Sequence, residues 1–315
     1  MREERLDDLR EEARRTGRVA EARISGISLA GGPIPPDAAS LPGYYGQPIV
    51  KAPVWTWQIG LYLFVGGTAG MSGAIALAAL VTGQTVDLVR AALGVALAGA
   101  VISPVLLIWD LGRPSRFLNM LRVFKWRSAM SMGAWTLVFF SNFAAAAFVV
   151  VTVAPGFHGL ALALVTGTAL TGVVLATYSG VLLGATVVPV WSAHHKLLPF
   201  HFGSVALGSA AVVLELLGFR VAALHAIALT VPIVETGIGI WLELPRQDAR
   251  GAMHYGATAL LLRAAALLTG PLPLIARLAG WVPAAGVCFL LGAVCSRYGW
   301  LLAGRAPAGV PSADA

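Results

Sequence analysis

Long apolar runs without charged residues dominate the chain. The longest extends from residue 128 to residue 195 and contains no Asp, Glu, Lys or Arg. Because backbone polar groups must be satisfied internally in lipid, a run of 18 or more apolar residues predicts a helix that crosses a bilayer. Dividing the chain at its charges, prolines and glycines therefore predicts an all-α polytopic membrane protein. The eight predicted spans are residues 54–82, 90–110, 128–153, 158–188, 198–217, 221–243, 253–275 and 281–303.

The pattern of charge and of Pro and Gly divides the chain into three parts. Residues 1–53 are a charged N-terminal helix followed by a Gly- and Pro-rich connector, residues 54–303 are the membrane domain, and residues 304–315 form a C-terminal tail. The first 25 residues lack the apolar core of a secretory signal peptide, so we expect them to remain on the mature protein. They are either a solvated helix or a helix that docks on a soluble partner.

Composition supports the membrane assignment. The chain is 57% hydrophobic and only 12% charged, with a mean hydropathy of +0.78, which leaves too little polar surface for a water-soluble protein of this size. The formal net charge of +7 comes without a basic and aromatic strip, so we expect no nucleic-acid partner. Cys288 and Cys295 are too few for an iron–sulfur cluster or a zinc site, and we interpret them as packing residues.

The basic residues are unequally divided between the two sides of the membrane. An even number of spans places both termini on one side. That side carries Arg113, Arg116, Arg122, Lys125, Arg127, Lys196, Arg246 and Arg250. The other side has Arg90, Arg220 and Arg277. The positive-inside rule therefore predicts cytoplasmic termini, although a basic loop can also receive an acidic partner.

Glycines on adjacent turns indicate where helices approach closely. The first span contains Gly66, Gly67, Gly70 and Gly73, and Gly180 and Gly184 lie in the fourth. Small residues at this spacing allow two backbones to come together within a membrane.

Ionisable residues inside predicted spans are functional candidates, because they are costly in lipid. Glu235 and Arg263 fall roughly 12 and 15 Å from the same side. They could form a structural ion pair or belong to a proton-transfer route. Glu215 and His225 approach the opposite side, where they are either exposed at the interface or part of a proton passage. Arg297, near the end of the last span, is expected to extend to the interface.

Histidines and aromatic residues separate two classes of redox site. No two histidines share a depth in the middle of the membrane, so a haem with two histidine ligands is not expected. Trp57, Gln58 and Tyr62 occupy the start of the first span, and Tyr178 approaches the same side in the fourth. An interfacial aromatic belt accounts for some of these residues. The deeper ones suit a quinone headgroup, whose carbonyl oxygens need hydrogen-bond donors.

Several motifs carry a resemblance to a known family. They are Trp55–Trp57, Gly66–Gly70, Asp110–Met120, Ser131–Trp135 and Tyr178–Thr186. Together they resemble the NrfD / polysulfide reductase membrane-subunit (PsrC-like) family over about residues 44–303. The Asp-Leu-Gly-Arg-Pro loop that begins at Asp110 is the most specific of them.

The resemblance implies an eight-helix subunit of a bacterial cytoplasmic membrane, built as two four-helix bundles without its own haem or metal. It implies a four-cubane, ferredoxin-like iron–sulfur partner and a molybdopterin catalytic subunit. Electrons would pass between the nearest cluster and menaquinone or ubiquinone, and proton translocation could accompany this transfer. The chain would not be catalytic alone. The headgroup residues would be Tyr62, with Gln58 and Trp57 beside it, and Tyr178. The family can have histidine at the position of Tyr62, and a phenol is a weaker base than imidazole.

The basic loops also suggest where a partner docks. Asp110, Arg113, Arg116, Arg122 and Lys125 are expected to face an acidic iron–sulfur subunit, with Asp110 pairing with Arg113 or Arg116 to stiffen the turn. Two other interpretations of the chain stay open. One is a transporter in which Glu235 and Arg263 recognise a solute, and the other is a pure anchor without a quinone site.

Overall fold

The computed structural model describes residues 56–110, 117, 121–122, 124–126, 128–186, 188–243 and 256–304. The chain divides into two units, residues 1–51 and 52–315, and all described residues belong to the second. The predictions for the N-terminal helix and connector, for Arg113 and Arg116, and for the tail after residue 304 lie outside the described residues.

Membrane-spanning helices account for most of the described chain. Eight helices are long and apolar enough to cross a bilayer, which confirms the all-α polytopic prediction. They are α3 (Trp57–Val81), α4 (Val86–Asp110), α6 (Ala129–Val153), α7 (His158–Gly184), α9 (Leu197–Leu216), α10 (Ala222–Glu243), the pair α12 (Gly256–Thr269) and α13 (Pro271–Leu278), and α14 (Val282–Ala303). A short helix, α8 (Pro189–Ala193), lies between α7 and α9.

The seventh span is broken, which the sequence analysis did not predict. Helix α12 ends at Thr269 and α13 begins at Pro271, with Gly270 between them. Proline has no backbone N–H and cannot continue the hydrogen-bond ladder of a preceding helix. Gly270 also has no side chain to separate it from Thr236 of α10, whose Cα lies 3.2 Å from the position a Cβ would take. The helical backbone of this span is therefore interrupted at Gly270.

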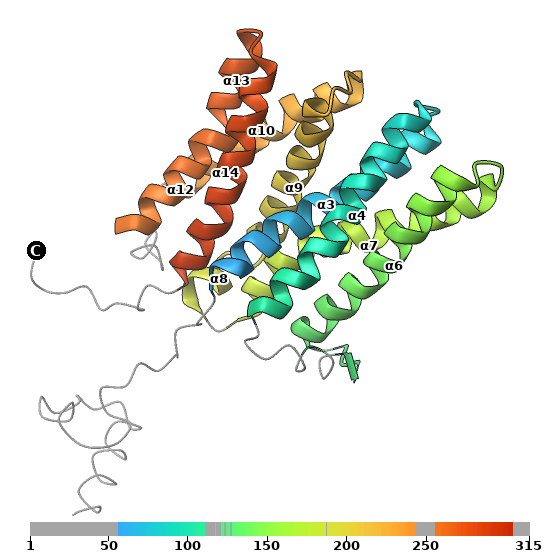
Figure 1. The fold of residues 1–315 in the computed structure, drawn as a ribbon. Helices are drawn as coiled ribbons and strands as arrows, with labels where there is room; N and C mark the ends of the chain where they lie inside the picture. Colours follow the sequence, from blue (N-terminus) through green and yellow to red (C-terminus); the bar gives the residue numbers. More distant parts are fainter. Residues whose placement is uncertain are drawn as a thin grey trace, which may run out of the picture. The chain divides into compact units, whose positions relative to one another are not determined.

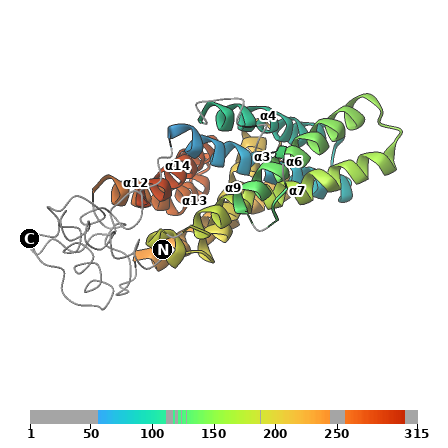
Figure 2. The ribbon, with the colours of Figure 1, turned by 90° about the horizontal axis from the view of Figure 1, so that it is seen from below.

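The helices form two groups, as the resemblance implied. Helices α3, α4, α6 and α7 contact one another, and α9, α10, α12, α13 and α14 form the second group. Helix α9 also packs against α3 and α7 and so joins the groups, as Figure 1 shows. In Figure 2, α6 and α7 again lie on the opposite side of α3 and α9 from α12 to α14.

Glycines bring the backbones of neighbouring helices into contact. A Cβ on Gly70 of α3 would overlap the carbonyl of Gly172 in α7, and a Cβ on Gly172 would overlap Gly70. A Cβ on Gly180 would likewise overlap the backbone of Leu198. The predicted close packing through the glycines of the first and fourth spans is confirmed.

Candidate functional site

Two tyrosines lie at matching depth in the first group of helices. We call the side where α3 begins and α14 ends the terminal face. Tyr62 lies about 12 Å from Gly70 along α3, and Tyr178 about 9 Å from Gly172 along α7, both toward the terminal face. They are only 6% and 8% exposed. A Cβ on Gly66 would lie 3.8 Å from the Tyr62 ring and 4.0 Å from Leu175, about one turn before Tyr178, so the structure brings these two predicted residues into the same α3–α7 contact.

Helix α6 closes the other side of Tyr178. A Cβ on Gly133 would overlap the Tyr178 ring and its hydroxyl oxygen. Glycine at this position therefore makes room for the phenol between α6 and α7. The requirement explains why Gly133 stands in the Ser131–Trp135 motif.

Buried polar atoms without hydrogen-bond partners lie on the helices that carry the two tyrosines or on their neighbours. Among the described residues, Gln58 Oε1, Ser103 Oγ and Trp135 Nε1 are buried and unpaired. Gln58 lies one turn before Tyr62, and Ser103 Oγ of α4 lies 3.3 Å from the position of a Cβ on Gly66, one turn after it. Buried polar groups without partners are rare and costly, and they are often explained by a missing ligand or water. Sequence reasoning found Gln58 but missed Ser103.

Trp57 lies at the rim of this region. Its side chain is 53% exposed and meets Trp109 of α4 edge to face, with ring centroids 5.9 Å apart. Tyr298 of α14 donates a hydrogen bond of 2.7 Å to the Trp57 carbonyl. The tryptophan therefore contributes an outer wall.

The end of α4 is tied to the start of α3. The Thr56 hydroxyl donates a hydrogen bond to Oδ1 of Asp110. The expected partners of Asp110, Arg113 and Arg116, lie outside the described residues. Arg122 and Lys125, in the connection from α4 to α6 at the terminal face, are exposed, as a docking role requires.

A second polar cluster lies in the other group of helices, around Glu235 of α10. Glu235 is 2% exposed. Its Oε2 lies 2.7 Å from Nδ1 of His201, in the geometry of an ion pair and not of an aligned hydrogen bond. The Ser204 hydroxyl donates to Oε1 of Glu235. On the other side of the imidazole, Nε2 of His201 lies 2.7 Å from Oγ of Ser296 in α14.

The predicted pairing of Glu235 with Arg263 is wrong. Arg263 of α12 instead binds Glu243, with 3.0 Å between Nε and Oε1, and both side chains are more than half exposed. Helix α10 turns Glu235 toward α9, whereas the long Arg263 side chain extends along the outer surface to the end of α10. A role of Glu235 or Arg263 in proton transfer stays a prediction.

Arg297 does not extend to the interface, contrary to expectation. It is 1% exposed, donates a 2.9 Å hydrogen bond to the Phe202 carbonyl, and lies 3.8 Å above the centre of the Phe202 ring. Its Nε and Nη1 have no partner among the described residues. Glu235 is near enough to interact with its charge. The distance of Arg297 from the end of its predicted span indicated its depth in the membrane. It did not indicate on which side of α14 the side chain lies.

The arginine also reaches the boundary between the two groups of helices. Arg297 Nη2 lies 3.9 Å, and the Ala176 Cα 4.0 Å, from the position of a Cβ on Gly67 in α3. Ala176 precedes Tyr178 by two residues on α7. Arg297 therefore lies between the buried Glu235 cluster and the backbone behind the two tyrosines.

Comparison with known families agrees with this arrangement. The family described as Polysulphide reductase, NrfD matches residues 47–242, more than half of the chain. The chain belongs to the NrfD family. A search of curated proteins found no match. NrfD proteins are membrane subunits of quinone-linked oxidoreductase complexes, and they work in general with iron–sulfur and molybdopterin subunits.

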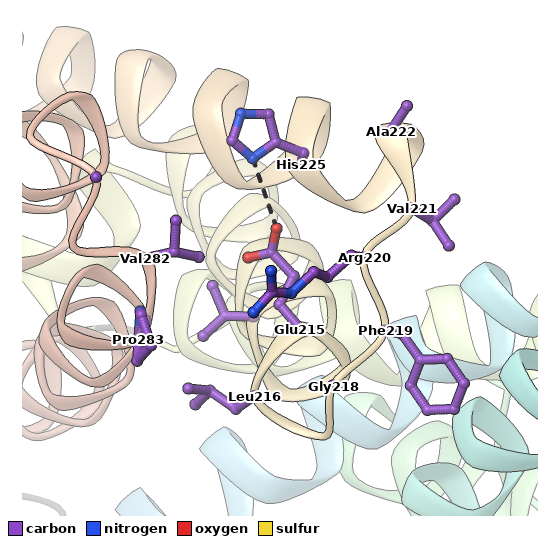
Figure 3. Close-up of a pocket in the computed structure, with 13 residues that line it drawn as sticks. Glu215, Leu216, Gly218, Phe219, Arg220, Val221, Ala222, His225, Val282 and Pro283 are labelled. Carbon is purple, nitrogen blue, oxygen red and sulfur yellow. Dashed lines mark ion pairs between the residues drawn. The ribbon is translucent and has the colours of Figure 1, made fainter.

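The remaining predicted candidates of this NrfD protein, Glu215 and His225, lie on the face opposite the terminal face. Arg277 of α13 binds Glu215 through two hydrogen bonds, of 3.0 Å and 2.5 Å, and its Nη1 lies 2.9 Å from Nδ1 of His225. Glu215 Oε1 is 3.8 Å from the same imidazole nitrogen. The cluster borders a cavity shown in Figure 3.

Sequence reasoning missed His201 because it falls near the start of its predicted span. In α9 it nevertheless faces α10 and α14, where it meets Glu235 and Ser296. The signal that could have found it was its spacing from Ser204, one turn later on the same helix. No group of three or more His, Cys, Asp or Glu side chains in the described part of the chain could hold a metal ion.

Proposed function

We propose that this chain exchanges electrons between an iron–sulfur subunit at the terminal face and menaquinone or ubiquinone bound among Gln58, Tyr62, Ser103 and Tyr178. The observation that carries the proposal is the meeting of two buried phenols with unpaired polar atoms at one depth. Such groups are costly when left alone in a membrane protein, and a headgroup with two carbonyl oxygens would satisfy them.

The chemistry fits the residue types. Reduction of a quinone takes up two electrons and two protons and gives a quinol. The Tyr62 and Tyr178 hydroxyls and the Ser103 hydroxyl can donate hydrogen bonds to the carbonyl oxygens and accept them from the quinol hydroxyls. The phenols hold the headgroup, and as weak bases they do not take up the protons readily. The protons of the reaction then come from other groups or from water.

The depth of the residues supports a headgroup near the terminal face. Tyr62 lies about 8 Å inside the start of α3, and Tyr178 about 9 Å inside the end of α7. At this depth the isoprenoid tail can leave between helices into lipid. A cluster in a subunit docked on the same face would be close enough for electron exchange.

We place the iron–sulfur subunit, of the four-cubane ferredoxin-like type, on the basic loop that contains Arg122 and Lys125, and a molybdopterin catalytic subunit beyond it. Both residues are exposed, and charge complementarity would orient an acidic partner. The excess of basic residues on this face supports its assignment to the cytoplasmic side of a bacterial membrane.

The Glu235 cluster is our candidate for proton exchange coupled to the quinone. Glu235 and His201 are within 2.7 Å, and Arg297 lies between them and the backbone behind Tyr178. The unpaired Nε and Nη1 of Arg297 are positions where buried water would bind. A change of charge at the quinone would change the electrostatic potential at Arg297 and, through this arginine, at Glu235.

The proposal is tested by purifying the wild-type complex from native membranes in mild detergent and measuring both co-purifying proteins and extracted quinone. We expect an iron–sulfur subunit and close to one quinone per chain. The variant Tyr62→Phe/Tyr178→Phe should retain the iron–sulfur subunit and lose most of the quinone. A wild-type chain that purifies alone and free of quinone contradicts the proposal, and solute flux in vesicles would then test a transporter.

A further inference from the structure

A cavity of about 630 Å³ lies on the face opposite the terminal face. It is bounded by the turn between α9 and α10 and by the beginning of α14, as Figure 3 shows. The proposed quinone site lies in the other group of helices, at the terminal face. The cavity is therefore a separate site.

Two helices begin at this cavity. Val221 and Ala222, at the start of α10, and Val282 and Pro283, at the start of α14, line it. The first turn of a helix has N–H groups without intrahelical partners and carries a partial positive charge. Neither helix has an acidic residue in its first turn, and the residue before α14 makes no side-chain cap. The start of α10 can therefore receive an anion, and so can the start of α14 through the N–H groups of residues other than Pro283, which has none.

An arginine adds a full positive charge. Arg220 lies in the turn between α9 and α10, and its side chain extends into the cavity toward Glu215 in Figure 3. It is exposed and, unlike Arg277, has no ion pair among the described residues. Its guanidinium is available for a ligand.

The acidic residue of the cavity is already neutralised. Arg277 holds both oxygens of Glu215, at 3.0 Å and 2.5 Å. The same guanidinium reaches Nδ1 of His225 at 2.9 Å. Because arginine can only donate, Nδ1 accepts in this contact, and Arg277 keeps its positive charge directed at Glu215 and His225. Arg277 is itself 6% exposed, with a buried Nε that has no partner in the described residues.

The lining is therefore rich in donors and has one uncompensated positive charge. Its surroundings are apolar: Leu217 is 59% exposed, Leu278 83% and Trp281 68%. An exposed tryptophan beside leucines is typical of the level where headgroups meet acyl chains. A phosphate that carries acyl chains matches both features.

We propose that this cavity binds the phosphate of an anionic phospholipid in the leaflet opposite the terminal face. Arg220 and the first turns of α10 and α14 bind the phosphate. The acyl chains lie along Leu217 and Leu278. The site would hold lipid whatever the redox partners of the chain are.

The test measures lipid binding to the delipidated, purified complex by native mass spectrometry. Short-chain phosphatidylglycerol, short-chain phosphatidylcholine and inorganic phosphate are added separately. We expect one phosphatidylglycerol per chain, bound about tenfold more tightly than phosphatidylcholine. Arg220→Gln should weaken that binding about tenfold, because one charge-assisted hydrogen bond is lost, and Arg220→Lys should recover part of it. The matched control is Arg90→Gln, an arginine on the same face that pairs with Asp87, which should bind like wild type.

Four outcomes would overturn the proposal. Equal binding of phosphatidylglycerol and phosphatidylcholine would show that the phosphate charge is not recognised. Binding of inorganic phosphate as tight as that of phosphatidylglycerol would assign the site to a free anion. Unchanged binding in folded Arg220→Gln, or equal weakening in Arg90→Gln, would place the lipid elsewhere.

Discussion

Oε2 of Glu235 lies 2.7 Å from Nδ1 of His201, and both side chains are buried inside membrane-spanning helices. An acid and an imidazole at this distance can share one proton as a carboxylate with an imidazolium or as a neutral acid with a neutral base. Moving the proton between them changes no net charge in the low-dielectric interior. The structure thus places two groups that can exchange a proton side by side inside the second group of helices.

Replacing Glu235 by Gln should slow quinone turnover by about tenfold or more, because a group that transfers protons is lost. Protons taken up per electron, measured with a pH indicator in proteoliposomes, should fall as well. The matched control is Glu243→Gln on the same helix, where the side chain is about half exposed and pairs with Arg263. Equal proton uptake by Glu235→Gln and wild type would remove Glu235 from the proton route.

Arg297 and Glu235 should be coupled in stability. Arg297→Met removes a buried positive charge near Glu235 and should destabilise the chain, whereas Arg297→Met/Glu235→Gln should recover part of the loss. A coupling energy of about 1 kcal/mol is expected for charges that interact in one buried network. Thermal unfolding of both single variants and the double variant in one detergent measures it. Strict additivity would mean that the two charges act independently.

Tyr178→Phe should lower the rate of quinone reduction by about tenfold, because a hydrogen bond to the headgroup is lost. Co-purification of the iron–sulfur subunit should be unaffected. Tyr298→Phe is the matched control, since it removes a phenol hydroxyl that binds the Trp57 carbonyl outside the proposed headgroup contacts. Full activity in Tyr178→Phe would favour a pure membrane anchor.

Gly70→Ala should destabilise the first group of helices by about 1–3 kcal/mol, the usual cost of overpacking. The added methyl would overlap the Gly172 carbonyl, and backbone cannot move aside as a side chain can. Gly237→Ala in α10, where no atom lies within 4 Å of the new Cβ, should unfold close to the wild-type temperature. Similar unfolding temperatures for both variants would contradict the close α3–α7 contact.

Charge reversal of Arg122 and Lys125 together should weaken binding of the iron–sulfur subunit and make the remaining association more sensitive to salt. Pull-down of the partner at several salt concentrations gives the measurement. Arg90→Glu on the opposite face serves as the control and should retain the partner. Retention by Arg122→Glu/Lys125→Glu at high salt would exclude this loop as the docking surface.

Much of the fold could be predicted because the membrane imposes a simple rule on the sequence. Apolar length located all eight crossings, and glycines of the first and fourth spans predicted that these helices pack closely against neighbours, although not which ones. The break at Gly270 was missed although Gly270-Pro271 is a turn signal. An apolar stretch long enough to cross the membrane satisfied the length rule and concealed the break.

For the candidate site, the depth of each residue in the membrane could be predicted, but the side of the helix on which its side chain lies could not. Tyr62 and Tyr178 were located correctly because both lie a similar number of residues from a helix end. The directions of the Arg297 and Arg263 side chains were predicted wrongly. Each step of one residue along a helix rotates the side chain by about 100°, and a helix that is apolar all round does not indicate which side faces the protein. The partners of Glu235 depended on that rotation, and on His201 and Ser296 from two other helices.

The contact between Gly70 and Gly172 has a mechanical consequence for the proposed quinone site. Where two main chains touch, no side chain can change its rotamer to make room. This part of the protein therefore cannot widen to accommodate a larger ligand. The spacing of Tyr62 and Tyr178 is then nearly the same with and without an occupant on this side. Adaptation to a bulky headgroup then falls to side chains and not to this part of the backbone.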